Sequence, residues 1–259
     1  MKLGDALDIK SHEVISLVGA GGKTSLMFTL AQELASNNKS VITTTTTKIL
    51  EPSSSETSLL LLETDEEKVI ELLLQNLDKH RHITLAMERL PSGKLKGVSP
   101  GFIMRLAELD GVSYIIVEAD GAAGKPLKAP NSVEPVIPEN TSLLIPIVGI
   151  DALGCRLTEE AVFRPEIVSR LTGLSSGDIV SAEAIAILIT HSEGIIRGSQ
   201  PHVKIVPFIN KVDLDDGLPK ARGLAYKILG MKHPQIERVI LGQTRFPEPA
   251  VEVISAARN

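Results

Sequence analysis

The stretch LVGAGGKTS at residues 17–25 constrains the fold of this chain more than any other. It follows the apolar run EVIS at 13–16 and leads into LMFTLA at 26–31, which indicates a strand, a glycine turn and a helix start. Glycine permits positive φ angles that bring backbone N–H groups around an anion, and the new helix directs its partial positive charge at the same point. The stretch therefore predicts a phosphate-binding loop.

Two side chains of this loop indicate a nucleotide. We expect the Lys23 ammonium to reach the outer phosphates, and the Thr24 hydroxyl to be a ligand of a Mg²⁺ ion that bridges them. The loop is short, because Leu17 stands where the common pattern has its first glycine. Read as G-x-x-G-K-T, it resembles the compact loop of the ATP-using amino-acid ligases of peptidoglycan synthesis. The residues predicted to bind phosphate are Gly19, Ala20, Gly21, Gly22, Lys23, Thr24 and Ser25.

The second element is an apolar strand that ends in two acids, SYIIVEADG at residues 113–121. A carboxylate at such a strand end can hold Mg²⁺ or polarise the attacking water. Glu118 and Asp120 are therefore predicted as catalytic residues, together with Lys23, and as metal ligands. The spacing from Glu118 to Gly121 resembles the E-x-x-G of the GTPases that deliver nickel and cobalt, which implies that Gly121 contacts the nucleotide. We expect the two lysines of residues 122–130 to face phosphate.

A run of five threonines and a lysine, residues 43–48, follows a predicted strand at 40–42. Such runs are often strand filler, and that interpretation stays open. In the functional interpretation, the last threonines and Lys48 lie at the carboxyl end of the sheet beside the phosphate loop, where hydroxyls hold Mg²⁺ or its waters. Thr46 is then a metal ligand along with Thr24.

The third element is the apolar strand at 203–209, which runs into Asn210-Lys211-Val212-Asp213. A strand that ends in N-K-x-D is the guanine-reading motif of GTPases, and here it follows the other two elements in the expected order. Asn210, Lys211 and Asp213 are therefore predicted to bind the base. Residues 241–244 are candidates for a further base contact, and Ser255-Ala256 is a weaker one.

Local signals predict where several elements begin. Thr64 with Glu67 predicts a capping box ahead of a helix, and Ser99-Pro100 predicts an N-cap followed by proline in the first turn. Residues 91–97 predict a mobile loop. Asp151 is interpreted either as a helix cap or as a residue of the site.

The order of the elements predicts one α/β domain over residues 1–259. With 43% hydrophobic residues, a chain of this length buries a large core. Strands alternate with helices throughout, which favours a mostly parallel sheet with right-handed crossovers. We therefore expect a P-loop NTPase-like three-layer fold, a mostly parallel central sheet flanked by helices.

Composition limits the partners and the compartment. A net charge of −5, 3% aromatic residues and no tryptophan provide neither a basic surface nor stacking platforms for nucleic acid. The single Cys155 excludes an intramolecular disulfide and a cysteine-based zinc site. The N-terminus lacks the long apolar region of a signal peptide, and no later apolar run approaches the 18 residues of a membrane span. We expect a cytoplasmic protein with no nucleic-acid or membrane partner, and the oligomeric state stays open.

The combined motifs resemble the YqeC family. The resemblance rests on the phosphate loop, the threonine–lysine run, and residues 117–130 and 207–213. Members of that family are described as accessory proteins of selenium-dependent molybdenum hydroxylases. This implies a nucleotide-binding maturation factor with a client enzyme. A broader likeness is to the class that holds the nickel-insertion GTPases and dethiobiotin synthetase.

Three functional hypotheses follow. The first is a Mg²⁺-dependent NTPase, using GTP, whose hydrolysis drives the loading of a metal, selenium or molybdenum cofactor into a client. The second is an ATP-dependent kinase or ligase acting on a small acid, motivated by the compact loop and by a second pocket implied at residues 149–154. The third is a module that binds nucleotide without hydrolysis. The sequence has no C-x-C or histidine-rich tract, which favours a switch acting on a partner over a direct metal carrier.

Overall fold

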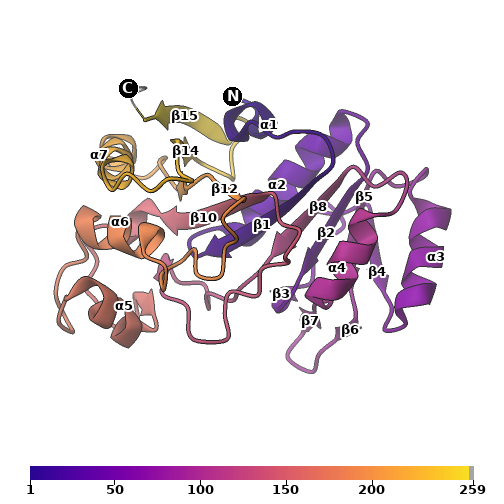
Figure 1. Ribbon diagram of the computed structural model, residues 1–259, viewed down its shortest axis with the longest axis horizontal. Helices are drawn as coiled ribbons and strands as arrows, with labels where there is room; N and C mark the ends of the chain where they lie inside the picture. Colours follow the sequence, from indigo (N-terminus) through magenta and orange to yellow (C-terminus); the bar gives the residue numbers. More distant parts are fainter. Residues whose placement is uncertain (257–259) are drawn as a thin grey trace.

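A large sheet of ten strands forms the centre of the protein (Figure 1), whose computed structural model describes residues 1–256. The strands of this sheet are β1 (Glu13–Gly19), β2 (Val41–Thr45), β4 (Leu59–Leu62), β5 (His82–Ala86), β8 (Tyr114–Glu118), β10 (Leu143–Gly149), β12 (Lys204–Ile205), β13 (Phe208–Asn210), β14 (Arg238–Gly242) and β15 (Ala250–Ser255). Their order is β15-β14-β13-β10-β1-β8-β2-β5-β4, with β12 beside β10. All pairs are parallel except β14 with β15, which confirms the predicted mostly parallel sheet.

Helices flank this sheet on both faces. They are α1 (Leu3–Leu7), α2 (Lys23–Ser36), α3 (Glu66–Asn76), α4 (Pro100–Ala107), α5 (Pro165–Thr172), α6 (Ala182–Thr190) and α7 (Gly217–Gly230), with a 3₁₀ turn at Ile150–Ala152. One hydrophobic core joins α1 and α2 to one face. On the other face, α5, α6 and α7 form a core with β10, β13 and β14, and α3 and α4 form another with β8, β2 and β5 (Figure 1). This confirms the three-layer α/β fold.

The register explains why the opposite face carries two cores. Successive residues of a strand point to opposite faces. In β1, Leu17 is in register with Ile145 and shares the α2 core with it, whereas Ser16 is in register with Val117 and Leu144. Val117 packs toward α3 and α4, and Leu144 packs toward α5 and α6. The phosphate-loop strand therefore lies at the boundary between the two cores of that face.

The structure confirms one of the two predicted helix starts and shifts the other by one residue. The Ser99 side chain accepts a hydrogen bond from the Phe102 N–H at 3.1 Å, with proline in the first turn, which confirms the N-cap of α4. The capping box predicted at Thr64 is wrong by one residue. Asp65 is the N-cap of α3 and accepts from the N–H groups of Glu67 and Lys68. A carboxylate also interacts favourably with the helix dipole.

The mobile loop predicted at residues 91–97 is wrong, because it contains a strand. β7 (Lys94–Lys96) pairs antiparallel with β3 (Lys48–Leu50) and with β6 (Glu88–Arg89). This small sheet is anchored by Ile49 and Leu95, which are buried in the α2 core. The sequence signal was weak because each strand has three residues or fewer, and its outer positions are polar. A second small pair joins β9 (Leu127–Lys128) to β11 (Val162–Phe163).

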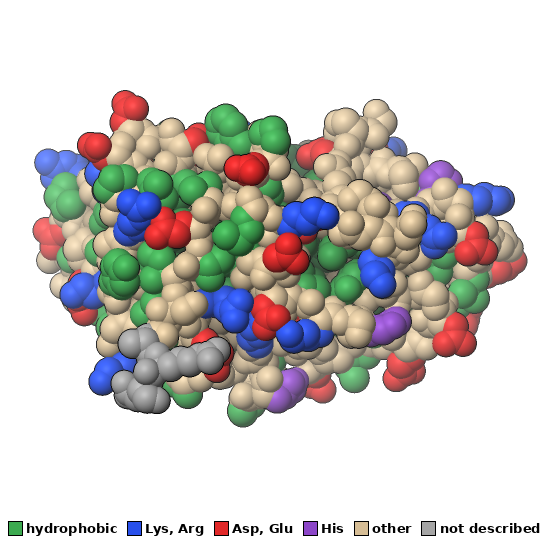
Figure 2. Space-filling view, turned by 90° about the horizontal axis from the view of Figure 1, so that it is seen from above, with side chains coloured by type: hydrophobic (Ala, Val, Ile, Leu, Met, Phe, Trp, Pro, Cys, Tyr) green, Lys and Arg blue, Asp and Glu red, His purple; other side chains and the backbone are tan. Residues whose placement is uncertain are grey.

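The outer surface mixes charges of both signs. On the face seen in Figure 2, the described Lys and Arg side chains are interspersed with Asp and Glu and form no continuous basic surface. Among residues 1–256, no helix is both long and apolar enough to cross a membrane. The last three residues of the predicted domain, 257–259, lie outside the described residues.

Gly97 fixes the small sheet to the end of β2, and its replacement tests this contact. A Cβ atom at Gly97 would lie 1.8 Å from the Thr45 carbonyl oxygen, so Gly97→Ala must displace one of the two backbones. We expect this variant to lower the free energy of unfolding by about 2 kcal/mol or more in urea titrations followed by circular dichroism. Gly101→Ala is the control, because nothing lies within 4 Å of its added Cβ and it should change stability by about 1 kcal/mol or less. Equal effects of the two substitutions would contradict the contact.

Candidate functional site

A cleft of about 850 Å³ lies at the carboxyl edge of the central sheet. Its walls are segments that directly follow β1, β8, β10, β13 and β14, together with residues of β3 and β7. Ligands of open α/β sheets bind at this edge, and the volume is within the range of about 300–1,000 Å³ that small-molecule sites occupy. All three motifs of the sequence contribute residues to it, including Lys23, Glu118 and Asn210.

The predicted phosphate loop joins β1 to α2 at the floor of the cleft. Gly21 and Gly22 adopt φ angles of 87° and 131°, which favour glycine. A Cβ atom would lie 2.2 Å from Gly149 N at the first position and 2.2 Å from Asn210 Nδ2 at the second. Helix α2 then begins at Lys23 with no side-chain cap. An uncapped helix start with a close glycine backbone is a suitable site for an anion.

The Lys23 ammonium is folded back into the loop. Its Nζ donates to the Gly19 carbonyl oxygen at 2.6 Å and lies 3.2 Å from Asp120 Oδ1 and 3.8 Å from Glu118 Oε1. Only 4% of the side chain is exposed. Burial by itself would lower the pKa of Lys23, but the charges of Asp120 and Glu118 outweigh it and raise the pKa. The lysine is therefore held in its charged form.

Two of the predicted metal ligands meet in the cleft. The Thr24 hydroxyl donates to Glu118 Oε2 at 2.7 Å, and both residues line the cavity. Burial raises the pKa of Glu118, although Lys23 and the Thr24 hydrogen bond act in the opposite direction. A hydroxyl and a carboxylate side by side at a helix start are oxygen donors of the kind that Mg²⁺ prefers.

The other two predicted metal ligands make different contacts. Asp120 Oδ2 accepts a hydrogen bond from the Gly19 N–H at 3.0 Å, so this side chain braces the phosphate loop from below. The Thr46 hydroxyl donates to the Val136 carbonyl oxygen at 2.7 Å. Within residues 1–256, no three His, Cys, Asp or Glu side chains are grouped to hold a metal ion. Mg²⁺ at a nucleotide typically uses one or two protein oxygens, with phosphates and waters as its other ligands.

A buried charge network extends from the loop into the core. It consists of Lys23, Asp120, Lys128, Glu134 and Arg164. The fully buried Lys128 lies 2.9 Å from Asp120 Oδ2 and 3.2 Å from Glu134, and it donates to the Gly121 carbonyl oxygen at 2.6 Å. Burial alone would raise the pKa of Glu134, yet Lys128 and Arg164 lower it.

This network corrects one expectation and adds residues that the sequence did not indicate. Lys128 was expected to face phosphate, which is wrong, because it is enclosed beneath the loop. Lys125 does line the cleft, where its Nζ donates to the Glu160 carbonyl oxygen. Glu134 belongs to no motif, and only its tertiary contact with Lys128 and Arg164 identifies it.

Asn210 connects the phosphate loop to the loop after β14. Its Nδ2 donates to the Gly21 carbonyl oxygen at 2.9 Å and to the Thr244 hydroxyl at 3.2 Å, and its Oδ1 accepts from the Thr244 N–H at 3.1 Å. Thr244 lines the cleft, so residues 241–244 do adjoin the predicted base site. Ser255 does not, because it pairs with Arg238 at the opposite end of β14.

The remaining residues of the N-K-x-D motif also line the cleft. Lys211 Nζ lies 2.6 Å from Asp151 Oδ2, and Asp213 is exposed at the wall. Asp151 is not a helix cap, because it lies inside the 3₁₀ turn Ile150–Ala152. The N-cap of that turn is Gly149. The segment after β10 thus contributes to this same cleft.

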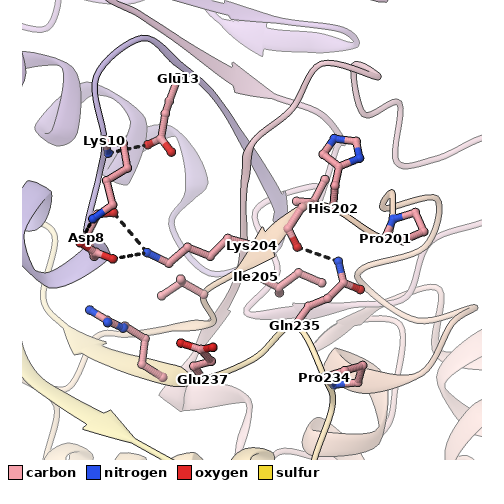
Figure 3. Close-up of a pocket in the computed structure, with 13 residues that line it drawn as sticks. Asp8, Lys10, Glu13, Pro201, His202, Lys204, Ile205, Pro234, Gln235 and Glu237 are labelled. Carbon is pink, nitrogen blue, oxygen red and sulfur yellow. Dashed lines mark hydrogen bonds and ion pairs between the residues drawn. The ribbon is translucent and has the colours of Figure 1, made fainter.

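A smaller cavity of about 350 Å³ lies at the amino edge of the sheet (Figure 3). Several of its polar groups are paired with one another, whereas the buried Nε of Arg238 has no hydrogen-bond partner among the described residues. Lys204 Nζ donates to the Asp8 backbone and side chain, Glu13 accepts from the Lys10 N–H, and Gln235 donates to the Val203 carbonyl oxygen. Hydrogen bonds from Lys10 and then Lys204 lower the pKa of Asp8 to about 2. The phosphate loop, the acidic strand end and the N-K-x-D residues lie at the other edge.

Replacing Lys128 tests whether the buried charge network stabilises the site. Lys128→Met keeps the volume but leaves Asp120 and Glu134 without their shared cation, and we expect it to lower the free energy of unfolding by about 3–5 kcal/mol. The control is Lys125→Met in the same segment, whose exposed hydrogen bond should be worth about 1 kcal/mol or less. Urea unfolding of both variants gives the comparison. Coincident unfolding midpoints would contradict the role assigned to Lys128.

Comparison with known proteins agrees with this assembly of motifs. The family model described as YqeC protein matches residues 15–166, which is more than half of the chain. A protein of Escherichia coli (strain K12), described as "Uncharacterized protein YqeC", is 31% identical over 208 residues, which cover 78% of this chain and 77% of that protein. The family match includes the phosphate loop, the threonine–lysine run and the acidic strand end. The chain belongs to the YqeC family.

Proposed function

We propose that this protein is a Mg²⁺-dependent nucleoside triphosphatase that prefers GTP. One observation carries the proposal: a single cleft contains the uncapped start of α2, the Thr24–Glu118 pair, and the N-K-x-D residues Asn210 and Asp213. These groups follow one another along the sheet edge in the order β13, β10, β1, β8. A nucleotide in the cleft would have its base at β13 and its phosphates at β1.

Phosphate binding requires an exchange of partners at Lys23. In the structure, the Gly19 carbonyl oxygen and two carboxylates surround the ammonium. The outer phosphates would supply stronger charge-assisted hydrogen bonds in their place. Asp120 would not be left as an isolated buried charge, because Lys128 and the Gly19 N–H still contact its Oδ2 atom. The network thus allows Lys23 to turn toward a ligand.

Thr24 and Glu118 fit the requirements of a Mg²⁺ ion at the phosphates. When bound, such an ion neutralises the charge that develops on the transferred phosphoryl group. The Glu118 carboxylate accepts a hydrogen bond from Thr24 in the structure. It would accept a hydrogen bond from a metal-bound water, or orient the attacking water. Asp120 would act on the loop backbone through Gly19, which makes Glu118 the stronger candidate for direct contact with the reaction.

Guanine preference is supported by the position of Asp213. Guanine presents N1–H and an exocyclic amino group as adjacent donors, and one carboxylate accepts both. Adenine has an acceptor at N1 and would leave Asp213 unpaired. Because Asp213 is exposed at the cleft wall, water can partly replace the lost bonds. We therefore expect discrimination of about 10-fold to 100-fold, well below that of an enclosed polar site.

The family resemblance motivates the proposed biological role. We propose a maturation factor that loads a metal, selenium or molybdenum cofactor into a client hydroxylase. The placement of the three motifs in one cleft supports a nucleotide-driven switch acting on a partner. The preference for GTP over ATP separates this proposal from a kinase or ligase that uses the same loop.

The phosphate site is tested by Lys23→Ala. Loss of the charge-assisted contacts should weaken binding of a non-hydrolysable GTP analogue with Mg²⁺ by about 10-fold to 100-fold in calorimetric titrations. Lys39→Ala, which removes an exposed lysine beyond the end of α2, is the charge-matched control and should bind like wild type. Unchanged affinity in a folded Lys23→Ala protein would remove the basis of the proposal.

The base site is tested by Asp213→Asn. The new amide should weaken GTP binding and improve binding of xanthosine triphosphate, whose C2 carbonyl oxygen accepts a hydrogen bond. Each change should be about tenfold at this exposed position. Titrations of both proteins with GTP, ATP and xanthosine triphosphate provide the measurement. A wild-type preference for ATP that the substitution leaves intact would refute the guanine assignment and favour the kinase or ligase hypothesis.

A further inference from the structure

The cleft extends past Glu118 to an end that the nucleotide does not need. In the sheet, β13 lies two strands from β1 on one side, and β2 lies two strands from β1 on the other. With strands about 4.8 Å apart, each side extends roughly 10 Å from the phosphate loop. If the proposed nucleotide has its base at β13, its terminal phosphate lies toward β8. The segment after β2 is then free for another ligand.

Lys48, Leu50 and Lys94 form this end of the cleft, which we call the lysine end. Lys48 and Leu50 alternate with the buried Ile49, and Lys94 is opposite Leu50 in the register of β3 and β7. Lys48 and Lys94 are therefore diagonal neighbours on one face, with roughly 7–8 Å between their backbones. The small sheet holds them in place through its buried residues and through the contact of Gly97 with Thr45.

The two lysines of this end have no countercharge. Among residues 1–256, neither Lys48 nor Lys94 forms an ion pair or a side-chain hydrogen bond. The other basic residues of the same small sheet do: Lys96 lies 2.9 Å from Glu88, and Arg89 lies 2.6 Å from Glu51. Within the small sheet, the two basic residues that lack a partner are thus the two that line the cleft.

The acids of the cleft do not compensate for these lysines. Glu118 contacts Thr24 and Lys23, and Asp151 contacts Lys211. Asp213 lies after β13, four strands from β2. Two like charges within one Debye length of each other, about 8 Å at physiological ionic strength, attract an anion. Leu50 beside them is 66% exposed and offers an apolar contact.

We propose that the lysine end binds a small anionic ligand, a molecule with a carboxylate or phosphate group and a short apolar part, in the part of the cleft beyond the terminal phosphate of the nucleotide. This inference rests on the proposed function, because it takes its direction from the nucleotide. Ammonium groups suit both carboxylate and phosphate as compact point charges.

The experiment measures anion binding to protein that is already saturated with Mg²⁺ and a non-hydrolysable GTP analogue. Butyrate serves as the carboxylate probe and inorganic phosphate as the phosphate probe, and the bound nucleotide blocks the phosphate loop. Two double variants are compared with wild type. The double Gln variant combines Lys48→Gln with Lys94→Gln, and the double Arg variant combines Lys48→Arg with Lys94→Arg. Lys39→Gln with Lys79→Gln is the control, because both lysines are exposed outside the cleft.

We expect saturable binding of at least one probe to wild type, weakened about tenfold or more in the double Gln variant. The double Arg variant and the control should bind like wild type, and high salt should reduce binding. Nucleotide affinity should stay the same in all variants. Failure of wild type to bind nucleotide would refute the proposed function. Normal nucleotide binding with no saturable anion binding, or with equal binding in the double Gln variant, would refute the lysine end as a subsite.

Discussion

The site depends on how the buried carboxylate of Asp120 is balanced. It lies beneath the phosphate loop between Lys23 and Lys128, with 1% of its surface exposed, and it also accepts the Gly19 N–H. An isolated charge at such a depth would cost several kcal/mol. Two cations satisfy it here, so one can move while the other stays. This arrangement both stabilises the loop and permits Lys23 to serve a ligand.

The order of strands turns separate motifs into one site. The phosphate loop, the acidic strand end and the N-K-x-D strand are far apart in sequence, but β1 lies beside β8 and two strands from β13. Parallel strands bring their carboxyl ends to one edge. Asn210, at the end of β13, then joins the phosphate loop to the loop after β14, because it forms hydrogen bonds with both Gly21 and Thr244. A shift of any one strand in the register would separate these groups.

The chain that follows β2 at the carboxyl edge of the sheet makes the cleft longer than the proposed nucleotide requires. Residues 46–50 leave the end of β2 and return as a strand of the small sheet, which places Lys48 beyond Glu118. The buried residues Ile49 and Leu95 hold this sheet against the α2 core. The proposed nucleotide site and the lysine end are therefore two parts of a continuous surface, with the Thr24–Glu118 pair between them.

The sequence by itself determined the α/β class, the parallel sheet, the glycine loop and the local identity of each motif. These follow from short-range physics: hydrophobic periodicity, the φ angles of glycine, and polar residues at strand ends. Only the tertiary structure decided that Lys128 is buried, that Glu134 and Arg164 complete its network, and that Thr46 bonds the Val136 carbonyl oxygen. Such contacts join segments many residues apart, and no local pattern records whether a charged side chain meets water or another charge.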